Sequence, residues 1–116
     1  NLDTSPIDYL LKRYELIKDF YDEDKIISIN DFMAIEEYIE ENEFFDLYNE
    51  LSQLAKQEYP ETILPSYYKG RFYEETGNPE KALHIYRSSY NMYEVEGLTK
   101  EYLFELADRI KEDFNY

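Results

Sequence analysis

The sequence predicts an all-α domain of about six antiparallel helices. Apolar residues recur at steps of three and four along most of the chain, and three glycines and four prolines separate these periodic segments. The 14 tyrosines and 7 phenylalanines follow the same spacing, whereas disordered acidic chains are poor in aromatic residues. A chain of 116 residues, 43% of them hydrophobic, is large enough for one core. We therefore expect residues 1–116 to form a single domain.

The first helix is predicted within residues 1–21. Ser5 is a suitable N-cap, and Pro6 fits the first helical position, where a backbone N–H would have no partner within the helix. The helix is expected to run to about Phe20. Its apolar stripe consists of Leu10, Leu11, Tyr14, Ile17 and either Phe20 or Tyr21.

The next two helices are predicted over about 29–41 and 44–58. Ser28, followed by an acid three residues later, has the spacing of a capping box. Asn42 is expected to end the first of these helices in a left-handed conformation, and Pro60 prevents the second from continuing. The expected buried positions are Phe32, Ile35, Tyr38 and Ile39 in the first helix, and Phe44, Leu47, Tyr48, Leu51, Leu54 and Ala55 in the second.

A further pair of helices is predicted over about 63–76 and 79–93. The sequence Gly77-Asn78-Pro79 between them is typical of a helix end followed at once by a helix start, because glycine adopts the left-handed conformation and proline fits the first turn. Asn78 is the expected N-cap of the second helix.

The spacing of small and aromatic residues predicts how this pair packs. Gly70 and Ala82 are small enough for the two helices to cross closely, while Tyr73 and Tyr86 fill the seam on either side of the Gly77 turn. The second helix is expected to pack through Leu83, Ile85, Ser89, Tyr90 and Tyr93 as well.

The last segment, 98–116, is predicted to be a C-terminal capping helix. Gly97 breaks the chain before it, and Thr99 is a suitable N-cap for a helix that runs to about Asp113. The expected buried residues are Tyr102, Leu103, Leu106, Ile110 and Phe114.

The chain contains an internal repeat. An offset of 35 residues aligns Asn42 with Gly77, so that region 28–60 is predicted to be a diverged copy of region 63–93.

Within the second copy, residues 64–92 resemble a tetratricopeptide repeat. The family's small, aromatic, turn, small and aromatic positions are occupied by Gly70, Tyr73, Gly77, Ala82 and Tyr86. Three positions depart from the family pattern: Ser66 stands in place of a large aromatic residue, Lys69 in place of a leucine and Glu94 in place of the closing proline. The resemblance implies helical hairpins that bury surface and perform no chemistry.

A second resemblance concerns the order of the parts. The N-terminal helix, a short link and about two repeats look like the C-terminal helical extension of bacterial proteins classed as esterases of the α/β-hydrolase superfamily. This resemblance implies a catalytic domain before Asn1 that carries the nucleophile, acid and histidine. Because the chain begins without an initiator methionine, we expect it to be one domain of a longer protein.

The charge excludes two classes of partner. The formal net charge is −15 at pH 7, and such a surface repels phosphate backbones and anionic lipid headgroups. We therefore expect no nucleic-acid partner and no membrane partner. No apolar run approaches the length of a membrane span, and there is no cysteine, so the chain is expected to be soluble, with cytoplasm and periplasm both open.

No residue pattern indicates catalysis, a cofactor or a metal. His84 is the only histidine and has neither a cysteine nor a second histidine to act with, so it is expected to face solvent. Glu36 and Glu40, one helical turn apart in a strongly acidic stretch, have the residue type for a cation site or an acid–base pair. A solvated acidic face is the interpretation we favour. The chain alone is expected to be non-catalytic.

The resemblance to tetratricopeptide repeats also implies a concave groove lined by the first helix of each hairpin. The groove residues would be Ile29, Phe32, Glu36 and Ile39 from one copy and Tyr67, Arg71 and Glu74 from the next, with Glu40, Leu64 and Glu75 beside them. A peptide with basic residues suits this wall better than a terminal carboxylate does. The sequence leaves open whether the groove binds a partner or is filled by the N-terminal helix or a neighbouring domain. The predicted partner is a protein or peptide, and first of all the chain's own preceding domain.

Overall fold

The computed structural model describes residues 27–115 of the chain. The predicted N-terminal helix lies outside this range. The described residues form five α-helices and one short 3₁₀ turn, so the all-α prediction is confirmed. In chain order the elements are α2 (Ile29–Asn42), α3 (Leu47–Glu58), α4 (Leu64–Glu75), α5 (Pro79–Ser88), η1 (Ser89–Asn91) and α6 (Lys100–Phe114).

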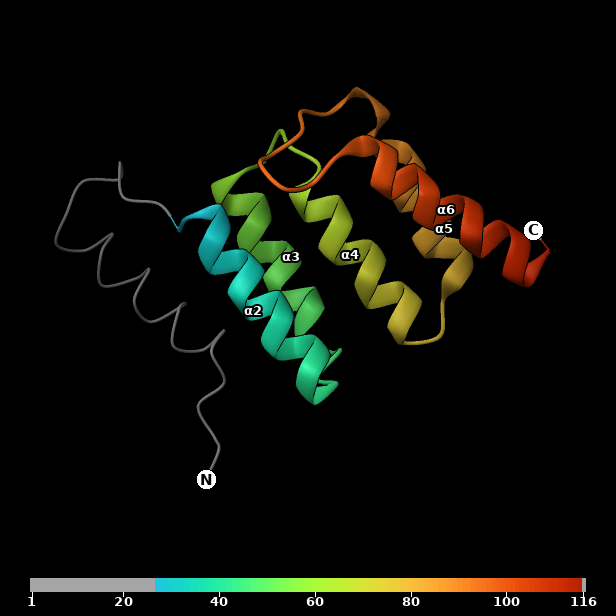
Figure 1. Cartoon of the computed structure of the whole chain (residues 1–116), viewed down its shortest axis with the longest axis horizontal. Coiled ribbons are helices and arrows are strands. Elements are labelled where there is room, and N and C mark those ends of the chain that lie inside the picture. The colour runs from blue at the N-terminus through green and yellow to red at the C-terminus, as the bar shows by residue number, and fades with distance from the viewer. Residues whose placement is uncertain (1–26, 116) are drawn as a thin grey trace, which may run out of the picture.

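The helices pack in two layers (Figure 1). α2 lies in front of α3, and α6 lies in front of α5. Side-chain contacts place α4 between α2 and α6 in the front layer, because Glu40 of α2 bonds to Arg71 of α4 and the ring of Tyr67 on α4 contacts Tyr102 on α6. Each of the pairs α3–α4, α4–α5 and α5–α6 is in close contact. The chain therefore alternates between the front and the back layer.

The ends of the helices follow from local sequence. The hydroxyl of Ser28 accepts a hydrogen bond of 3.1 Å from the backbone N–H of Asp31, and that of Thr99 accepts one of 3.2 Å from Tyr102, so these two predicted N-caps are confirmed. Asn78, also predicted as an N-cap, precedes α5 but its side chain makes no capping hydrogen bond. Gly77 adopts a left-handed conformation with φ of +94°. Gly77 therefore turns the chain between α4 and α5, as predicted. Glycine is favoured there because residues with a side chain rarely adopt this φ.

The core fills the space between the two layers. Its centre is an aromatic stack in which the ring of Tyr68 on α4 packs against Phe32 of α2 and Tyr48 of α3, with ring centroids 6.1 and 6.0 Å apart. Of the predicted seam residues, Gly70, Ala82 and Tyr86 are buried between α4 and α5, whereas Tyr73 is only partly buried.

The turn between α2 and α3 differs from the prediction. Asn42 is the last residue of α2, and the left-handed position is Glu43, with φ of +57°. α3 begins at Leu47 and not at position 44, because the backbone N–H of Leu47 bonds to the carbonyl of Phe44 and closes a four-residue turn. Phe44 was expected to be buried but is 45% exposed, since this turn carries its ring outward against Tyr38.

The predicted extension of the fifth helix to 93 is also wrong. α5 ends at Ser88, and Tyr90 and Tyr93, expected to be buried, are 69% and 70% exposed. Two contacts explain the early end. The Ser89 hydroxyl donates to the carbonyl of Tyr86 and so competes with the backbone hydrogen bonds that would continue the helix. The backbone N–H of Ile63 donates to the carbonyl of Tyr93 at 2.9 Å.

In α6, two of the residues expected to be buried are exposed. Tyr102 and Phe114 lie at the solvent side of the helix, whereas Leu103, Leu106 and Ile110 are buried as predicted. The apolar stripe of α6 is therefore narrower than the sequence pattern indicates.

Candidate functional site

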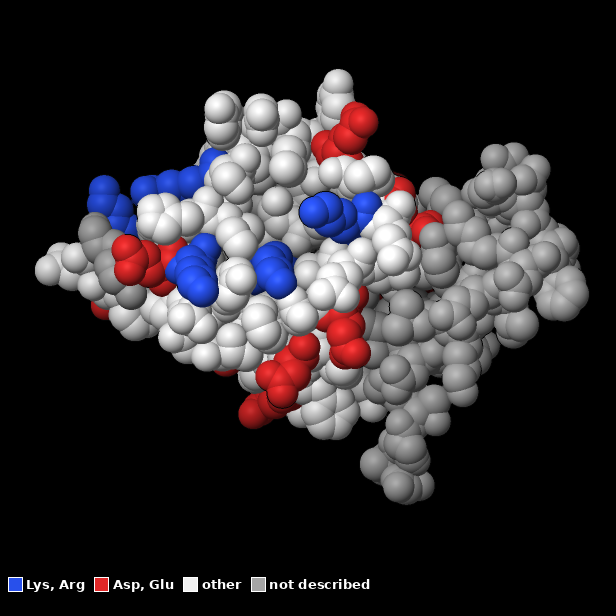
Figure 2. Space-filling model, turned by 180° about the vertical axis from the view of Figure 1, so that it is seen from behind, with Lys and Arg blue, Asp and Glu red and all other residues white. Residues whose placement is uncertain are grey.

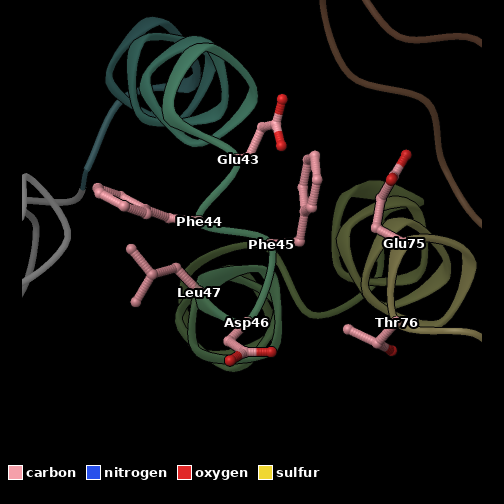
Figure 3. Close-up of a pocket in the computed structure, with 7 residues that line it drawn as sticks. All are labelled: Glu43, Phe44, Phe45, Asp46, Leu47, Glu75 and Thr76. Atoms are coloured by element: carbon pink, nitrogen blue, oxygen red, sulfur yellow. The ribbon is translucent and has the colours of Figure 1, made fainter.

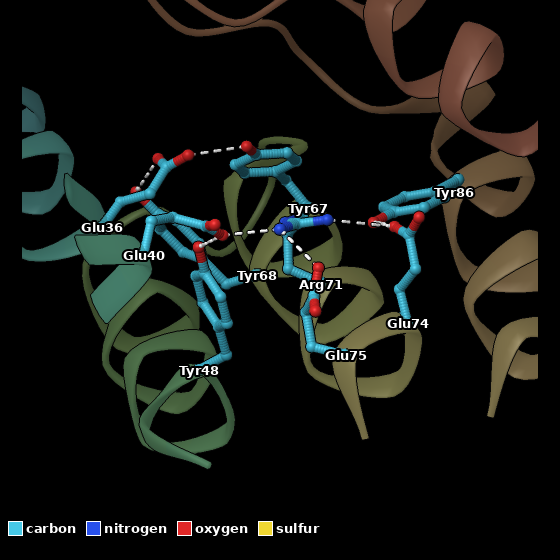
Figure 4. Close-up of polar contacts among 9 residues, drawn as sticks. All are labelled: Glu36, Glu40, Tyr48, Tyr67, Tyr68, Arg71, Glu74, Glu75 and Tyr86. Atoms are coloured by element: carbon cyan, nitrogen blue, oxygen red, sulfur yellow. Dashed lines mark hydrogen bonds and ion pairs between the residues drawn. The ribbon is translucent and has the colours of Figure 1, made fainter. Parts of the chain in front are cut away.

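A cluster of charged and phenolic side chains lies on the front layer, around Arg71 of α4 (Figure 4). One guanidinium nitrogen, Nη2, is 2.5 Å from a carboxylate oxygen of Glu40 on α2 and 2.9 Å from one of Glu75. The other, Nη1, is 3.2 Å from Glu74. The Arg71 side chain is only 15% exposed. Its charge is therefore already engaged by three carboxylates.

Tyrosine hydroxyls donate to the same group of glutamates. Tyr67 donates to Glu36 at 2.6 Å, and Tyr86 donates to Glu74 at 2.9 Å. In addition, Tyr68 donates to Glu36 at 3.4 Å and Tyr48 donates to Glu40. Among residues 27–115, every buried side-chain nitrogen and oxygen has a hydrogen-bond partner. We call the set Glu36, Glu40, Tyr48, Tyr67, Tyr68, Arg71, Glu74, Glu75 and Tyr86 the Arg71 cluster.

Helical spacing brings these groups to one face. Tyr67, Arg71 and Glu74 are separated by four and three residues on α4, so they lie above one another on the same side of that helix. Glu36 and Glu40 are one turn apart on α2 and meet this side. The cluster therefore joins α2 to α4 through side chains, beyond the apolar packing beneath it.

The two glutamates of α2 have opposite electrostatic behaviour. Burial raises the pKa of Glu36 above its ordinary value of 4.5, and the hydrogen bond from Tyr67 and the charge of Arg71 only partly offset this effect. Burial also acts on Glu40, but the bonds from Tyr48 and Arg71 outweigh it and lower the pKa of that carboxyl. Arg71 therefore holds Glu40 in its charged form more firmly than Glu36.

Arg71 stays charged and the four tyrosines of the cluster stay neutral at neutral pH. Burial opposes the charge of Arg71, yet the bond and charge of Glu40 raise the Arg71 pKa. Burial and the neighbouring carboxylates raise the pKa of each tyrosine in the cluster, namely Tyr48, Tyr67, Tyr68 and Tyr86. The phenols are therefore hydrogen-bond donors and not nucleophiles. With four carboxylates and one guanidinium, the cluster is a negatively charged surface.

The structure brings together four of the seven predicted groove residues: Glu36, Tyr67, Arg71 and Glu74. It places Phe32 and Ile39 elsewhere, because both are fully buried in the core beneath this surface, and Ile29 is partly buried against the same core. The expected apolar part of the groove wall is therefore wrong. Packing of α2 on α3 and α4 turns these side chains inward, which leaves the acids of α2 outward.

Sequence reasoning missed the tyrosines that reach the cluster from α3 and α5. Tyr48 was expected only as a buried residue and Tyr86 only as a seam residue, but both hydroxyls bond to glutamates on the front layer. The available signal was the choice of tyrosine over phenylalanine at buried positions, since a buried hydroxyl requires a partner.

A hollow of about 290 Å³ extends the surface from the Arg71 cluster to α6. The ring of Tyr102 forms one side, with its centroid 6.1 Å from that of Tyr67. The lining residues are Met33, Glu36, Tyr67, Gly97, Leu98 and Tyr102. Apart from one acid, this lining is apolar or aromatic, and it suits an apolar side chain next to a cation.

A second hollow, of about 450 Å³, lies at the other end of the cluster, between the α2–α3 turn and the end of α4 (Figure 3). In Figure 3 the ring of Phe45 stands between Glu43 and Glu75. The remaining lining residues are Phe44, Asp46, Leu47 and Thr76. Acidic groups therefore continue along the front layer from the Arg71 cluster to this turn.

Three further observations concern chemistry and location. His84 is exposed on α5, as predicted. Within the described range, no three histidine, aspartate or glutamate side chains come together in a way that would hold a metal ion. No helix of residues 27–115 is long and apolar enough to cross a membrane.

Comparison with known proteins places the fold but not the function. No model of a protein family matches the chain, and no curated protein is significantly similar to it. A crystal structure of an uncharacterised protein from Capnocytophaga ochracea DSM 7271 superposes with a TM-score of 0.85 and 23% sequence identity. The match covers 97% of this chain but 31% of the solved chain. The likeness shows a shared helical fold, and the present chain spans under a third of the length of that protein.

Proposed function

We propose that the chain is a non-catalytic, tetratricopeptide-like interaction module that binds a basic segment of a protein. The segment would bind on the α2–α4–α6 face, which we define as the Arg71 cluster together with the hollow beside Tyr102. The observation that carries this proposal is the composition of the Arg71 cluster, in which four carboxylates surround one guanidinium. Such an excess of negative charge on a helical face complements lysine and arginine side chains.

The contacts of the cluster define where a partner's cation would bind. Glu40 has 39% of its side chain exposed although it accepts bonds from Tyr48 and Arg71, and both bonds go to the same oxygen, so its other oxygen has room for a further donor. Glu75, one turn beyond Arg71, also bonds to Arg71 and keeps 30% of its side chain exposed. The hollow beside Tyr102 would accept an apolar side chain of the same segment, and aromatic-lined pockets of this kind are frequent anchors at protein interfaces.

The partner we propose first is the domain that precedes Asn1 in the parent protein. The solved protein of the same fold supports this choice, because the helical unit is under a third of that chain. A basic surface on the preceding domain would then pack against the α2–α4–α6 face, and the unit would serve as an accessory to that domain.

The second candidate is that the unit is the C-terminal helical domain of an esterase-like hydrolase whose catalytic domain precedes Asn1. The order of parts in the sequence favours it, as does the length of the solved protein relative to this chain. The test is the coding sequence upstream of Asn1. A Gly-x-Ser-x-Gly segment followed by a later histidine would support the candidate, and its absence would contradict it.

The binding proposal is tested by selecting peptides from a random phage-displayed library on the immobilised chain. We expect enrichment of peptides that combine lysine or arginine with an apolar anchor. Their binding to Glu75→Gln should weaken by about threefold to tenfold, as expected for the loss of one charged contact. The matched control is Glu80→Gln, an exposed position on α5 that loses the same charge. Enrichment of acidic or uncharged peptides, or equal weakening by both variants, would contradict the proposal.

A further inference from the structure

Three lysines from three different helices lie in a row away from the Arg71 cluster. Lys56 of α3 and Lys69 of α4 line the same hollow, and the ammonium groups of Lys69 and Lys81 lie 5.5 and 5.4 Å from the ring centroid of Tyr73. Viewed from behind, where α3 and α5 lie, the molecule shows lysine and arginine side chains spread over its middle (Figure 2). A positive surface of this kind stands out on a chain with a net charge of −15.

The charges of this row are not neutralised within the described part of the chain. The ion pairs there are made by Arg71 and Arg87. Lys69 donates instead to the neutral side chain of Asn49 and lies over aromatic rings, which fixes its position without cancelling its charge. The row is therefore available to an anionic group from outside.

The hollow beside the row is lined by both apolar and hydroxyl-bearing side chains and has a volume of about 340 Å³. Its lining, besides Lys56 and Lys69, consists of Ser52, Gln53, Pro60, Pro65, Ser66, Ile85, Ser88 and Met92. Two of the three departures from the tetratricopeptide pattern, Ser66 and Lys69, are in this lining. A serine in place of a large aromatic residue leaves space at this position, and a lysine in place of leucine adds a charge at its edge.

We propose that Lys56, Lys69 and Lys81, with the adjoining hollow, form a second interaction surface that binds an acidic segment of a protein. An apolar side chain of the segment would fill the hollow over Ile85 and Met92, and carboxylates on either side of it would bond to the lysines. This surface and its partner are distinct from those of the α2–α4–α6 face.

The total charge of the chain favours a short acidic peptide over larger anions. A nucleic-acid strand or a second copy of the chain would extend beyond the lysine row, and the net charge of −15 opposes the binding of either. A peptide of a few residues covers only the row. At physiological salt, charges more than about 8 Å away are largely screened, so the lysines in contact with the peptide dominate.

The test uses a fluorescein-labelled peptide in which glutamate and leucine alternate, with binding followed by fluorescence anisotropy at physiological salt. The triple variant Lys56→Gln, Lys69→Gln and Lys81→Gln should bind it at least about tenfold more weakly, as expected for the loss of three charged contacts. The matched control is Lys100→Gln, Arg109→Gln and Lys111→Gln on α6, which loses the same charge and should change the affinity by less than about threefold.

Three outcomes would overturn the proposal. Equal weakening by both triple variants would show attraction to overall charge and not to the row. If a peptide with glutamine in place of glutamate bound equally well, the carboxylates would not be needed for binding. If a single-stranded oligonucleotide bound more tightly than the acidic peptide, the surface would be a nucleic-acid site and not a protein site. Circular dichroism checks the folding of each variant, and the double variant Lys56→Gln and Lys81→Gln, at two exposed positions, gives the same comparison if Lys69→Gln disturbs the helix.

Discussion

The ring of Tyr86 lies directly against the backbone of Gly70, so closely that a Cβ atom on Gly70 would be 2.2 Å from Cε1 of Tyr86 and 2.6 Å from Cζ. The absence of a side chain at position 70 therefore allows α4 and α5 to approach each other. The same approach lets the Tyr86 hydroxyl pass between the layers and donate to Glu74 at 2.9 Å. The contact between Gly70 and Tyr86, which the sequence predicts as helix packing, therefore also positions the Tyr86 side chain in the Arg71 cluster.

Gly70→Ala should destabilise the fold although alanine is the better helix former. The overlap with Tyr86 forces backbone or ring displacement, for which we expect a loss of about 1–3 kcal/mol, larger than the gain of about 1 kcal/mol in helix propensity. Urea denaturation measures the free energy of unfolding. Tyr86→Leu shortens the opposing side chain, so Gly70→Ala should be less harmful in that background. Additive effects of the two substitutions would contradict the proposed overlap.

Arg71→Gln should lower stability by about 1–3 kcal/mol, because it leaves Glu40 and the partly buried Glu74 without the cation that they bond to. Arg87→Gln is the matched control. Arg87 forms an exposed ion pair with Asp108, and such pairs contribute at most about 1 kcal/mol. Chemical denaturation of both variants makes the comparison. If Arg87→Gln lost as much stability as Arg71→Gln, the Arg71 cluster would stabilise the fold no more than an exposed ion pair does.

The opposite pKa shifts of Glu36 and Glu40 predict opposite pH dependence. Burial raises the pKa of folded Glu36, so its stabilising contribution is complete below about pH 4.5 and is lost as the pH rises through the raised value. Glu36→Gln should therefore gain stability relative to the unsubstituted chain as the pH rises from about 4 to 7. Unfolding free energies measured across this pH range test the trend.

Glu40→Gln should show the reverse trend. Although burial acts against the charged form, bonds from Tyr48 and Arg71 lower the pKa of folded Glu40, so its contribution is present above about pH 4.5 and is lost as the pH falls through the lowered value. The deficit of Glu40→Gln should thus be largest near neutral pH and shrink on acidification. Parallel pH profiles for the two variants would contradict the electrostatic account of the cluster.

The N-caps provide a test of local structure. Thr99→Ala removes the hydroxyl that accepts from the Tyr102 N–H and should cost about 1 kcal/mol in unfolding free energy. Asn78→Ala should cost less, because the side chain of Asn78, although predicted as a cap, makes no capping hydrogen bond. Thermal or urea unfolding distinguishes the two. Equal losses would mean that Asn78 caps α5 in solution.

Several features were predictable from the sequence because they depend on residues within one or two helical turns. The hydroxyls of Ser28 and Thr99 bond three residues ahead, Gly77 turns the chain at its own φ angle, and the core-facing positions of α3 follow the helical period. These local rules placed most of the helices within a few residues of their observed bounds.

The tertiary structure decided the rest, because those features depend on contacts between residues far apart in the sequence. The bond from Tyr67 to Glu36 joins residues separated by 31 positions, and the backbone bond between Ile63 and Tyr93 ends α5 early from outside the helix. The helical pattern identifies which residues are apolar, but it does not specify which acid a tyrosine hydroxyl meets. It also does not show that lysines from α3, α4 and α5 form one row. Packing of the two layers fixed both arrangements.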